Sequence, residues 1–210
     1  MTLESTLRLL SAAVLATTMA VGVRARLRAH HAGGNVPRRA EGIALMIGLR
    51  GVAGVWAFGF MAWLIDPRWI RWAELPLPGF LRWTGALLLM LSVPLYAWVF
   101  HHLGLNLTDT VVVRHQATLI RTGPYRWMRH PLYGFGGLFV TGWMLVTANA
   151  LVMVAGIAAA ALIVARTRIE ERFLIERFGD AYRDYMARTG RFFPRIGRSR
   201  PALLGSSARR

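Results

Sequence analysis

Residues 121–137 read RTGPYRWMRHPLYGFGG and separate two long apolar parts of the chain. Lipid cannot satisfy the hydrogen bonds of an irregular backbone, so a stretch like this belongs at the membrane face or in a cavity enclosed by protein. Pro124 and Pro131 fix φ and push the residues before them towards extended geometry. We therefore expect a stiff polar loop that ends where a helix begins, near Pro131 or Leu132.

The composition of the chain is typical of a membrane protein. Its 210 residues suffice for one domain, 55% of them are hydrophobic, and the mean hydropathy is +0.39. The net charge is +16, and every basic residue is an arginine. Such a charge suits nucleic acid or an anionic membrane surface. Because the arginines lie between and after the apolar blocks, we favour the membrane and expect no nucleic-acid partner.

Five apolar segments predict an all-α integral membrane protein with about five transmembrane helices. They are residues 7–23, 43–65, 80–100, 132–146 and 151–165. The last two are short and predict a tilted helical hairpin, packed through the small residues Gly137, Thr141, Gly156 and Ala160. A charge within a span is costly, so Arg50 in the second segment is expected to face the bundle interior.

Three regions follow from this pattern. Residues 1–100 hold three N-terminal helices, and residues 101–194 form a second region. That region consists of a long loop with a β-like run at 110–113, the hairpin, and a helix continuing past Arg166 through Tyr185. Residues 195–210 are predicted to be a basic disordered tail.

Charge also predicts orientation. Arginine-rich connections alternate with the neutral connection 66–78 and the uncharged turn 147–149. This indicates an N-terminus outside and a C-terminus and active site in the cytoplasm. The all-arginine, alanine-rich composition is typical of bacteria, so we expect the inner membrane. For residues 7–23 a cleaved signal peptide is the alternative, although the cations follow that apolar run.

Two groups of residues could carry chemistry. Glu170 and Glu171 lie just beyond the last apolar segment and could bind a cation or an ammonium group, or else form a solvated helix start paired with neighbouring arginines. Residues 125–133 contain two tyrosines, Arg129 and His130, which supply donors, a titratable ring and aromatic faces. The alternative for them is an interfacial anchor.

Other chemistries find no support in the sequence. The six histidines have no partners at metal-ligand spacing, so we expect no metal site. The absence of cysteine excludes disulfides, thiolate metal sites and a cysteine nucleophile. There is no G-x-S-x-G elbow for a serine hydrolase and no P-loop for nucleotide hydrolysis.

The order of short motifs resembles the isoprenylcysteine carboxyl methyltransferase family, and phospholipid N-methyltransferases are similar in the same region. The resemblance covers about residues 103–194 and implies that the region 101–194 is the catalytic, cofactor-binding part of the chain. Its motifs are LG-x-NL from Leu103, TGPYR from Thr122, RHPLYG from Arg129, the pair Glu170-Glu171, and FG-x-x-Y-x-x-Y from Phe178.

This resemblance implies a membrane methyltransferase that uses S-adenosylmethionine, releases S-adenosylhomocysteine and has no Rossmann fold. The residues it implies around the cofactor are Gly123, Pro124, Tyr125, Arg129, His130, Pro131, Tyr133 and Gly134, with Glu170 or Glu171 holding the ammonium group. Arg166 or Arg168 would orient an anionic acceptor. If the acceptor is an amine, His130 or a glutamate would be needed as base.

The acceptor implied by the resemblance is lipophilic and enters sideways between helices. Carboxyl methylation is the first hypothesis, with a phospholipid (phosphatidylethanolamine) N-methyltransferase or a thiol methyltransferase as alternatives. Two other classes stay open: a membrane reductase using NADPH, and a non-enzymatic binding or assembly module. The sequence leaves the oligomeric state undetermined.

Overall fold

The computed structural model describes residues 2–31, 43–104 and 118–195, and this part of the chain is helical with no β-strand. The all-α fold class is confirmed. In chain order the elements are α1 (Leu3–His31), α2 (Ile43–Ile65), the 3-10 helix η2 (Pro67–Ala73), α3 (Gly79–Leu103), the 3-10 helix η4 (Gly123–Arg126), α4 (Pro131–Thr147), α5 (Ala150–Phe178) and α6 (Asp180–Arg188).

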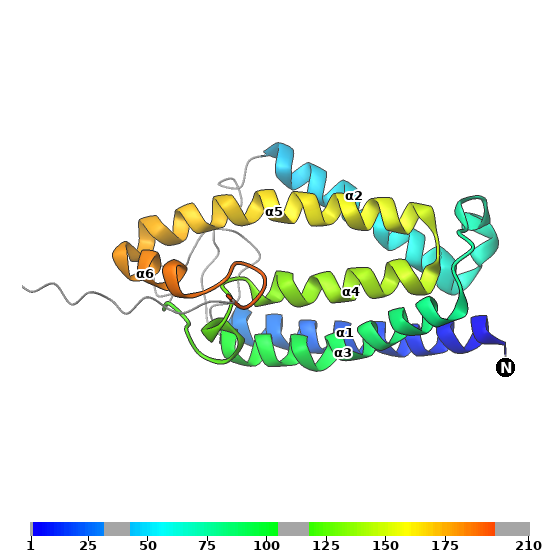
Figure 1. Cartoon of the computed structure of the whole chain (residues 1–210), viewed down its shortest axis with the longest axis horizontal. Helices are drawn as coiled ribbons and strands as arrows, with labels where there is room; N and C mark the ends of the chain where they lie inside the picture. Colours follow the sequence, from blue (N-terminus) through cyan, green and yellow to red (C-terminus); the bar gives the residue numbers. More distant parts are fainter. Residues whose placement is uncertain (1, 32–42, 105–117, 196–210) are drawn as a thin grey trace, which may run out of the picture.

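The first five α-helices alternate in direction along the long axis of the molecule (Figure 1). In the described residues α1, α2, α3 and α5 are long and apolar enough to cross a membrane, and the apolar α4 is shorter. Its 17 residues span about 25 Å, against roughly 30 Å for a bilayer core. The chain is thus an integral membrane protein, and the short fourth segment is confirmed.

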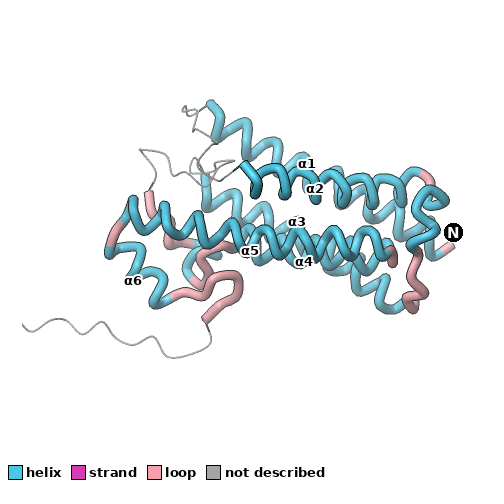
Figure 2. The backbone as a smooth tube through the Cα atoms, turned by 90° about the horizontal axis from the view of Figure 1, so that it is seen from above, coloured by secondary structure: helices cyan, strands magenta, loops and turns pink. Residues whose placement is uncertain are grey.

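The two ends of the bundle differ. One end carries α6 and the loop 118–130 and is called the basic end below; the other carries η2 and the turn at Ala148 and Asn149. Figure 2 shows α6 at the basic end, beyond the other helices, with the N-terminus at the opposite end. The run 110–113, predicted to be β-like, and residues 196–210 of the predicted disordered tail lie outside the described residues.

Helices α3 and α4 cross closely through two glycines. A Cβ atom at Gly85 would lie 2.8 Å from the carbonyl oxygen of Gly142, and one at Gly142 would lie 2.9 Å from the carbonyl oxygen of Gly85. Absent side chains therefore allow backbone contact here. This crossing places the start of α4, and the polar loop before it, beside the end of α3.

The opposite end is tied together by polar contacts. Ala148 adopts left-handed geometry with φ of 46°, and the Asn149 side chain then caps α5 by accepting from the backbone N–H of Leu151 at 3.0 Å. The same side chain donates to the carbonyl of Ile70 in η2 at 2.8 Å. The predicted hairpin is confirmed, and its turn is fixed to the preceding connection.

Two expectations about helices are wrong. The helix expected to run through Tyr185 stops at Phe178, because Gly179 takes φ of 55° and starts a new direction for α6. Arg50 is exposed rather than turned inward. It lies about 10 Å along α2 from Ile43, so its long side chain can reach towards the basic end.

Candidate functional site

A buried carboxylate forms the centre of the basic end. The side chain of Glu171 on α5 is only 5% exposed. It accepts from Arg129 Nε at 2.8 Å and from Arg191 Nη2 at 2.5 Å, and it lies 3.3 Å from His130 Nε2. These donors compensate for the burial of the charge. Glu171 therefore joins α5 to the polar loop and to the segment that follows α6.

That segment, residues 190–193, runs across the polar loop and is called the strap below. The backbone N–H groups of Arg129 and His130 donate to the carbonyls of Gly190 and Arg191 at 2.9 and 3.0 Å. The strap also lies against the first turn of α4, where a Cβ atom at Gly134 would be 2.4 Å from the carbonyl oxygen of Phe192. A glycine is needed at that position for the strap to pass.

Tyrosines of α6 hold the loop from the other side. The Tyr185 hydroxyl donates to the carbonyl of Tyr125 at 2.6 Å. Burial raises the pKa of Tyr185 to about 12, although Arg129 and Arg121 act to lower it. Burial also raises the pKa of Tyr125, and the Glu170 carboxylate raises it further. Both phenols therefore stay protonated at neutral pH, so Tyr185 keeps its role as donor.

Glu170 faces a different environment from its neighbour. Its side chain is 27% exposed, its Oε2 lies 3.3 Å from the Tyr133 hydroxyl, and its Oε1 lies 4.0 Å from His130 Nδ1. The imidazole of His130 thus stands between the two glutamates and stacks on the Tyr133 ring at a centroid distance of 5.8 Å. The result is an accessible carboxylate bordered by aromatic faces.

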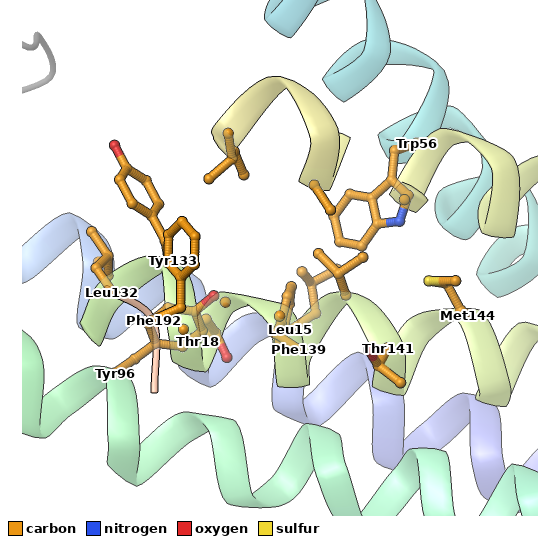
Figure 3. A pocket seen from close by; sticks show the side chains of 18 of the residues that line it. Leu15, Thr18, Trp56, Tyr96, Leu132, Tyr133, Phe139, Thr141, Met144 and Phe192 are labelled. Carbon is orange, nitrogen blue, oxygen red and sulfur yellow. The ribbon is translucent and has the colours of Figure 1, made fainter. Parts of the chain in front are cut away.

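An apolar chamber of about 760 Å³ begins beside Tyr133 and extends into the bundle. Figure 3 shows Tyr133 and Phe192 at one end of the chamber and Trp56 and Met144 at the other. Its wall draws on α1, α2, α3, α4, α5 and the strap. The volume lies in the usual range for ligand pockets.

The chamber opens on the flank of the bundle. Met19 and Val23 on α1 and Ile157 on α5 belong to its lining, yet they are 61, 49 and 60% exposed. Apolar residues at the rim of a membrane protein face lipid rather than water. The opening therefore lies between α1 and α5.

The small residues of the hairpin divide into two roles. Gly137 and Thr141 on α4 and Gly156 and Ala160 on α5 all line the chamber. No atom lies within 4 Å of a Cβ built at Gly137, so this glycine leaves space for the chamber. Gly156 is buried, and a Cβ there would lie 2.9 Å from Val140 Cγ1 and 3.0 Å from Met144 Sδ on α4. The predicted tight packing of the hairpin is therefore confirmed at Gly156 and does not hold at Gly137.

The structure brings together only part of the predicted site. Tyr133 and Gly134 line the chamber, and Tyr125, His130 and Glu170 gather around its polar end. The remaining residues lie outside the chamber and hold the polar loop and α4 in place. Arg129 pairs with Glu171, Pro131 starts α4, and Pro124 is buried in the loop beside Gly123.

Three of the predicted residues lie away from the chamber. Gly123, with φ of 57°, packs on the ring of His102, where a Cβ atom would clash at 2.4 Å. Arg166 is half-buried and Arg168 is exposed, and neither lines the chamber. The part of the chain that the structure describes holds no cluster of three potential metal ligands.

Sequence reasoning missed the strap and one cation. Arg191, Phe192 and Phe193 come shortly after the last tyrosine motif, which ends at Tyr185, and their cation and aromatics could have been read as an extension of it. Arg26 lines the chamber from α1. Its signal is helical spacing, because Leu15, Met19, Gly22 and Arg26 repeat every three or four residues and all line the chamber.

Fold and site together define a class of protein: an all-α integral membrane protein with a buried carboxylate cluster and an apolar chamber meeting at one end. Residues 80–181 match the phospholipid methyltransferase family. This range runs from the first turn of α3 to the start of α6. The matched residues make up just under half of the chain, and this similarity agrees with the methyltransferase resemblance of the sequence motifs.

Two curated relatives are similar to parts of this chain, and the name of the first agrees with the family match. Protein-S-isoprenylcysteine O-methyltransferase of Dictyostelium discoideum is 30% identical over 122 residues, which cover 56% of this chain and 52% of the relative. The cobalt-zinc-cadmium resistance protein CzcN of Cupriavidus metallidurans is 38% identical over 84 residues, covering 40% of this chain and 38% of the relative. The chain thus spans about half or less of the length of these relatives.

Proposed function

We propose that the chain is an S-adenosylmethionine-dependent methyltransferase that acts on a lipophilic acceptor within the membrane. The family match and the isoprenylcysteine methyltransferase relative support the reaction class. The observation that carries the proposal is the double role of Tyr133. Its ring lines the apolar chamber, while its hydroxyl lies 3.3 Å from the Glu170 carboxylate. A polar site and an apolar site therefore share one wall.

The residues at the polar end suit the cofactor. Glu170 offers a partly exposed carboxylate for an ammonium group. The rings of Tyr133, His130 and Phe192 lie nearby and can face a positively charged sulfur. Arg129 and Arg191 are paired with Glu171, so they serve the cluster rather than the phosphates of a nicotinamide cofactor.

The chamber suits the tail of the acceptor. Its opening between α1 and α5 gives a route from the bilayer, and its aliphatic and aromatic wall gives an apolar tail a favourable environment. A tail held there places the head group at the Tyr133 end, next to the cofactor residues. When bound, S-adenosylmethionine supplies a methyl group whose transfer to a carboxylate forms an O–C bond and breaks the S–C bond, leaving the electron pair on sulfur and moving no proton.

The protein's own contribution is then positioning and exclusion of water. The strap and α4 cover the polar end, and the helices enclose the tail, so both reactants are held in a low-dielectric space. Because a carboxylate or thiolate needs no deprotonation, these effects suffice for such acceptors. An amine would need a base, and His130, between the two glutamates, is the candidate.

Binding of the product S-adenosylhomocysteine tests the cofactor site. We expect calorimetry in detergent to detect it for the purified chain and to detect no binding of NADPH. Glu170→Gln removes a charge-assisted hydrogen bond and should weaken binding about ten- to a hundredfold, from about 1.5–3 kcal/mol. Glu176→Gln is the matched control, since Glu176 is an exposed glutamate on the same helix. If the wild type, Glu170→Gln and Glu176→Gln bound S-adenosylhomocysteine with equal affinity, Glu170 would not be part of the cofactor site.

A second variant tests the chamber. Gly137→Leu places a side chain into the chamber without meeting any protein atom within 4 Å at its Cβ position. It should abolish methylation of lipophilic acceptors and leave S-adenosylhomocysteine affinity unchanged. The control is Gly51→Leu, where a Cβ atom on α2 also has open space but no part in the chamber. Full activity of Gly137→Leu would show that the acceptor binds elsewhere.

A further inference from the structure

We propose that Arg26 of α1 binds the head group of the acceptor and makes the enzyme select anionic over cationic acceptors. The inference rests on the proposed function and adds to it a residue that determines specificity. Arg26 lies in the N-terminal helix, before residues 80–181 that match the family. Acceptor choice would therefore depend on a helix outside that match.

The position of Arg26 follows from the two helices that form the long sides of the chamber. On α1 the lining runs from Leu15 to Arg26, and on α4 it runs from Leu132 to Met144. These stretches cover rises of about 16 and 18 Å. The helices are antiparallel, and Arg26 and Tyr133 both lie at the basic end of their stretches. The cation thus stands at the same level as the proposed cofactor residues.

The charge of the chamber lining determines which head groups Arg26 can favour. Among the described lining residues there is no carboxylate, and Arg26 supplies the charged side chain. A guanidinium at the edge of an apolar chamber attracts a carboxylate or phosphate and can hold it in a bidentate contact. It repels an ammonium group at the same place, where water screens the interaction less than in bulk. An acid is therefore favoured over a protonated amine of equal tail length.

Arg26 also fits this task better than the arginines that the sequence suggested. Arg166 and Arg168 on α5 do not line the chamber, so neither faces a tail-bound acceptor directly. Arg26 shares the cavity with the tail. Arg26 is exposed at the chamber mouth, so it can meet the acceptor as it enters from between α1 and α5.

The experiment compares acidic with amine-bearing acceptors, and it includes one acid and one amine that share the same tail. Purified protein in nanodiscs is assayed with a long-chain fatty acid, an S-farnesylcysteine analogue, the corresponding long-chain amine, and phosphatidylethanolamine. We expect methylation of the acids, and Arg26→Gln should raise their KM about ten- to a hundredfold with kcat changed far less. Arg26→Lys should restore part of this loss. S-Adenosylhomocysteine affinity should stay at the wild-type value in both variants.

The matched controls are Arg24→Gln and Arg28→Gln, which remove the same charge from exposed positions in the same part of α1 without touching the chamber. They should leave KM unchanged. A binding assay that needs no turnover uses a fluorescent fatty acid and its neutral amide. Arg26→Gln should weaken binding of the acid and spare the amide.

The outcomes separate this inference from the proposed function. A wild-type protein that fails to bind S-adenosylhomocysteine overturns the methyltransferase proposal itself. A protein that binds S-adenosylhomocysteine but methylates the amine preferentially, or binds the fluorescent acid equally well with and without Arg26, overturns the role of Arg26 alone. If Arg24→Gln and Arg28→Gln raised the KM for the acids as much as Arg26→Gln, the effect would come from general surface charge, and the specific role of Arg26 would be overturned.

Discussion

At the scale of single residues, two adjacent glutamates have different surroundings. Successive residues of a helix point about 100° apart, so Glu170 and Glu171 cannot face the same partner. Glu171 is buried among Arg129, Arg191 and His130, whereas Glu170 lies beside the Tyr133 hydroxyl with more of its side chain exposed. We infer a structural role for Glu171 and a ligand-binding role for Glu170.

Replacing Glu171 should therefore cost stability first. Glu171→Gln leaves two buried or half-buried guanidinium groups without their counter-charge, and breaking such a pair typically costs about 3–5 kcal/mol. We expect a clearly lower Tm in detergent, measured by intrinsic fluorescence. Glu170→Gln and the exposed control Glu176→Gln should unfold near the wild-type temperature. A wild-type Tm for Glu171→Gln would show that the cluster contributes little to folding.

The sequence identified Glu170 and Glu171 as candidates but could not show which one binds a ligand and which one is structural. Both glutamates follow the same apolar segment, and helical spacing alone makes either one a candidate. The deciding partner, Arg191, lies 20 residues further on, in a strap whose path depends on the break at Gly179. Local pattern carries no information about such a contact.

At the scale of elements, packing is decided by where glycines meet. The bounds of α2 coincide with the apolar segment 43–65, because hydropathy alone defines that helix. The closeness of α3 and α4 instead depends on Gly85 and Gly142 facing each other. Small-residue spacing in the sequence indicated tight packing between α4 and α5, which holds at Gly156 but not at Gly137, because spacing does not show which face a small residue occupies.

Gly142→Ala should be destabilising even though alanine is the better helix former. Its Cβ would lie 2.8 Å from Leu89 Cγ and 2.9 Å from the Gly85 carbonyl oxygen, an overlap that typically costs about 1–3 kcal/mol. Gly54→Ala on α2 meets nothing within 4 Å and should gain up to about 1 kcal/mol from helix propensity. In detergent, the Tm of Gly142→Ala should therefore fall below that of the wild type, and the Tm of Gly54→Ala should rise above it. A shift of Gly142→Ala upwards would contradict the tight crossing.

At the scale of the whole molecule, charge is divided between the two ends. Glu4 pairs with Arg82, and Asp66 pairs with Arg68, so acids offset arginines at the opposite end. The basic end carries most of the arginines of the described chain, on α1, the polar loop, α5 and α6. By the positive-inside rule we propose that the basic end, with the candidate site, faces the cytoplasm.

The absence of cysteine makes this orientation simple to test. A single cysteine at exposed Trp72 in η2 marks the opposite end, and one at exposed Asp184 in α6 marks the basic end. In intact bacterial cells a membrane-impermeant maleimide should label Trp72→Cys, and it should label Asp184→Cys only after permeabilisation. The cysteine-free parent is the control. Labelling in the reverse order would place the site outside.

The chamber is the feature of the whole molecule that the sequence could not supply. Five apolar segments predict five helices, but the space between them depends on which side chains each helix turns towards its neighbours. Trp56 on α2 and Met144 on α4 are ordinary membrane residues in the sequence and become the inner end of a cavity only after packing.

The strap is synthesised later than the helices that it connects to the candidate site. Residues 190–193 leave the ribosome after every helix of the bundle, while membrane helices are inserted as they emerge. Until the strap arrives, Glu171 lacks Arg191 and the wall of the chamber lacks Phe192. A nascent chain whose helices α1 to α5 already sit in the bilayer would therefore still have an incomplete candidate site.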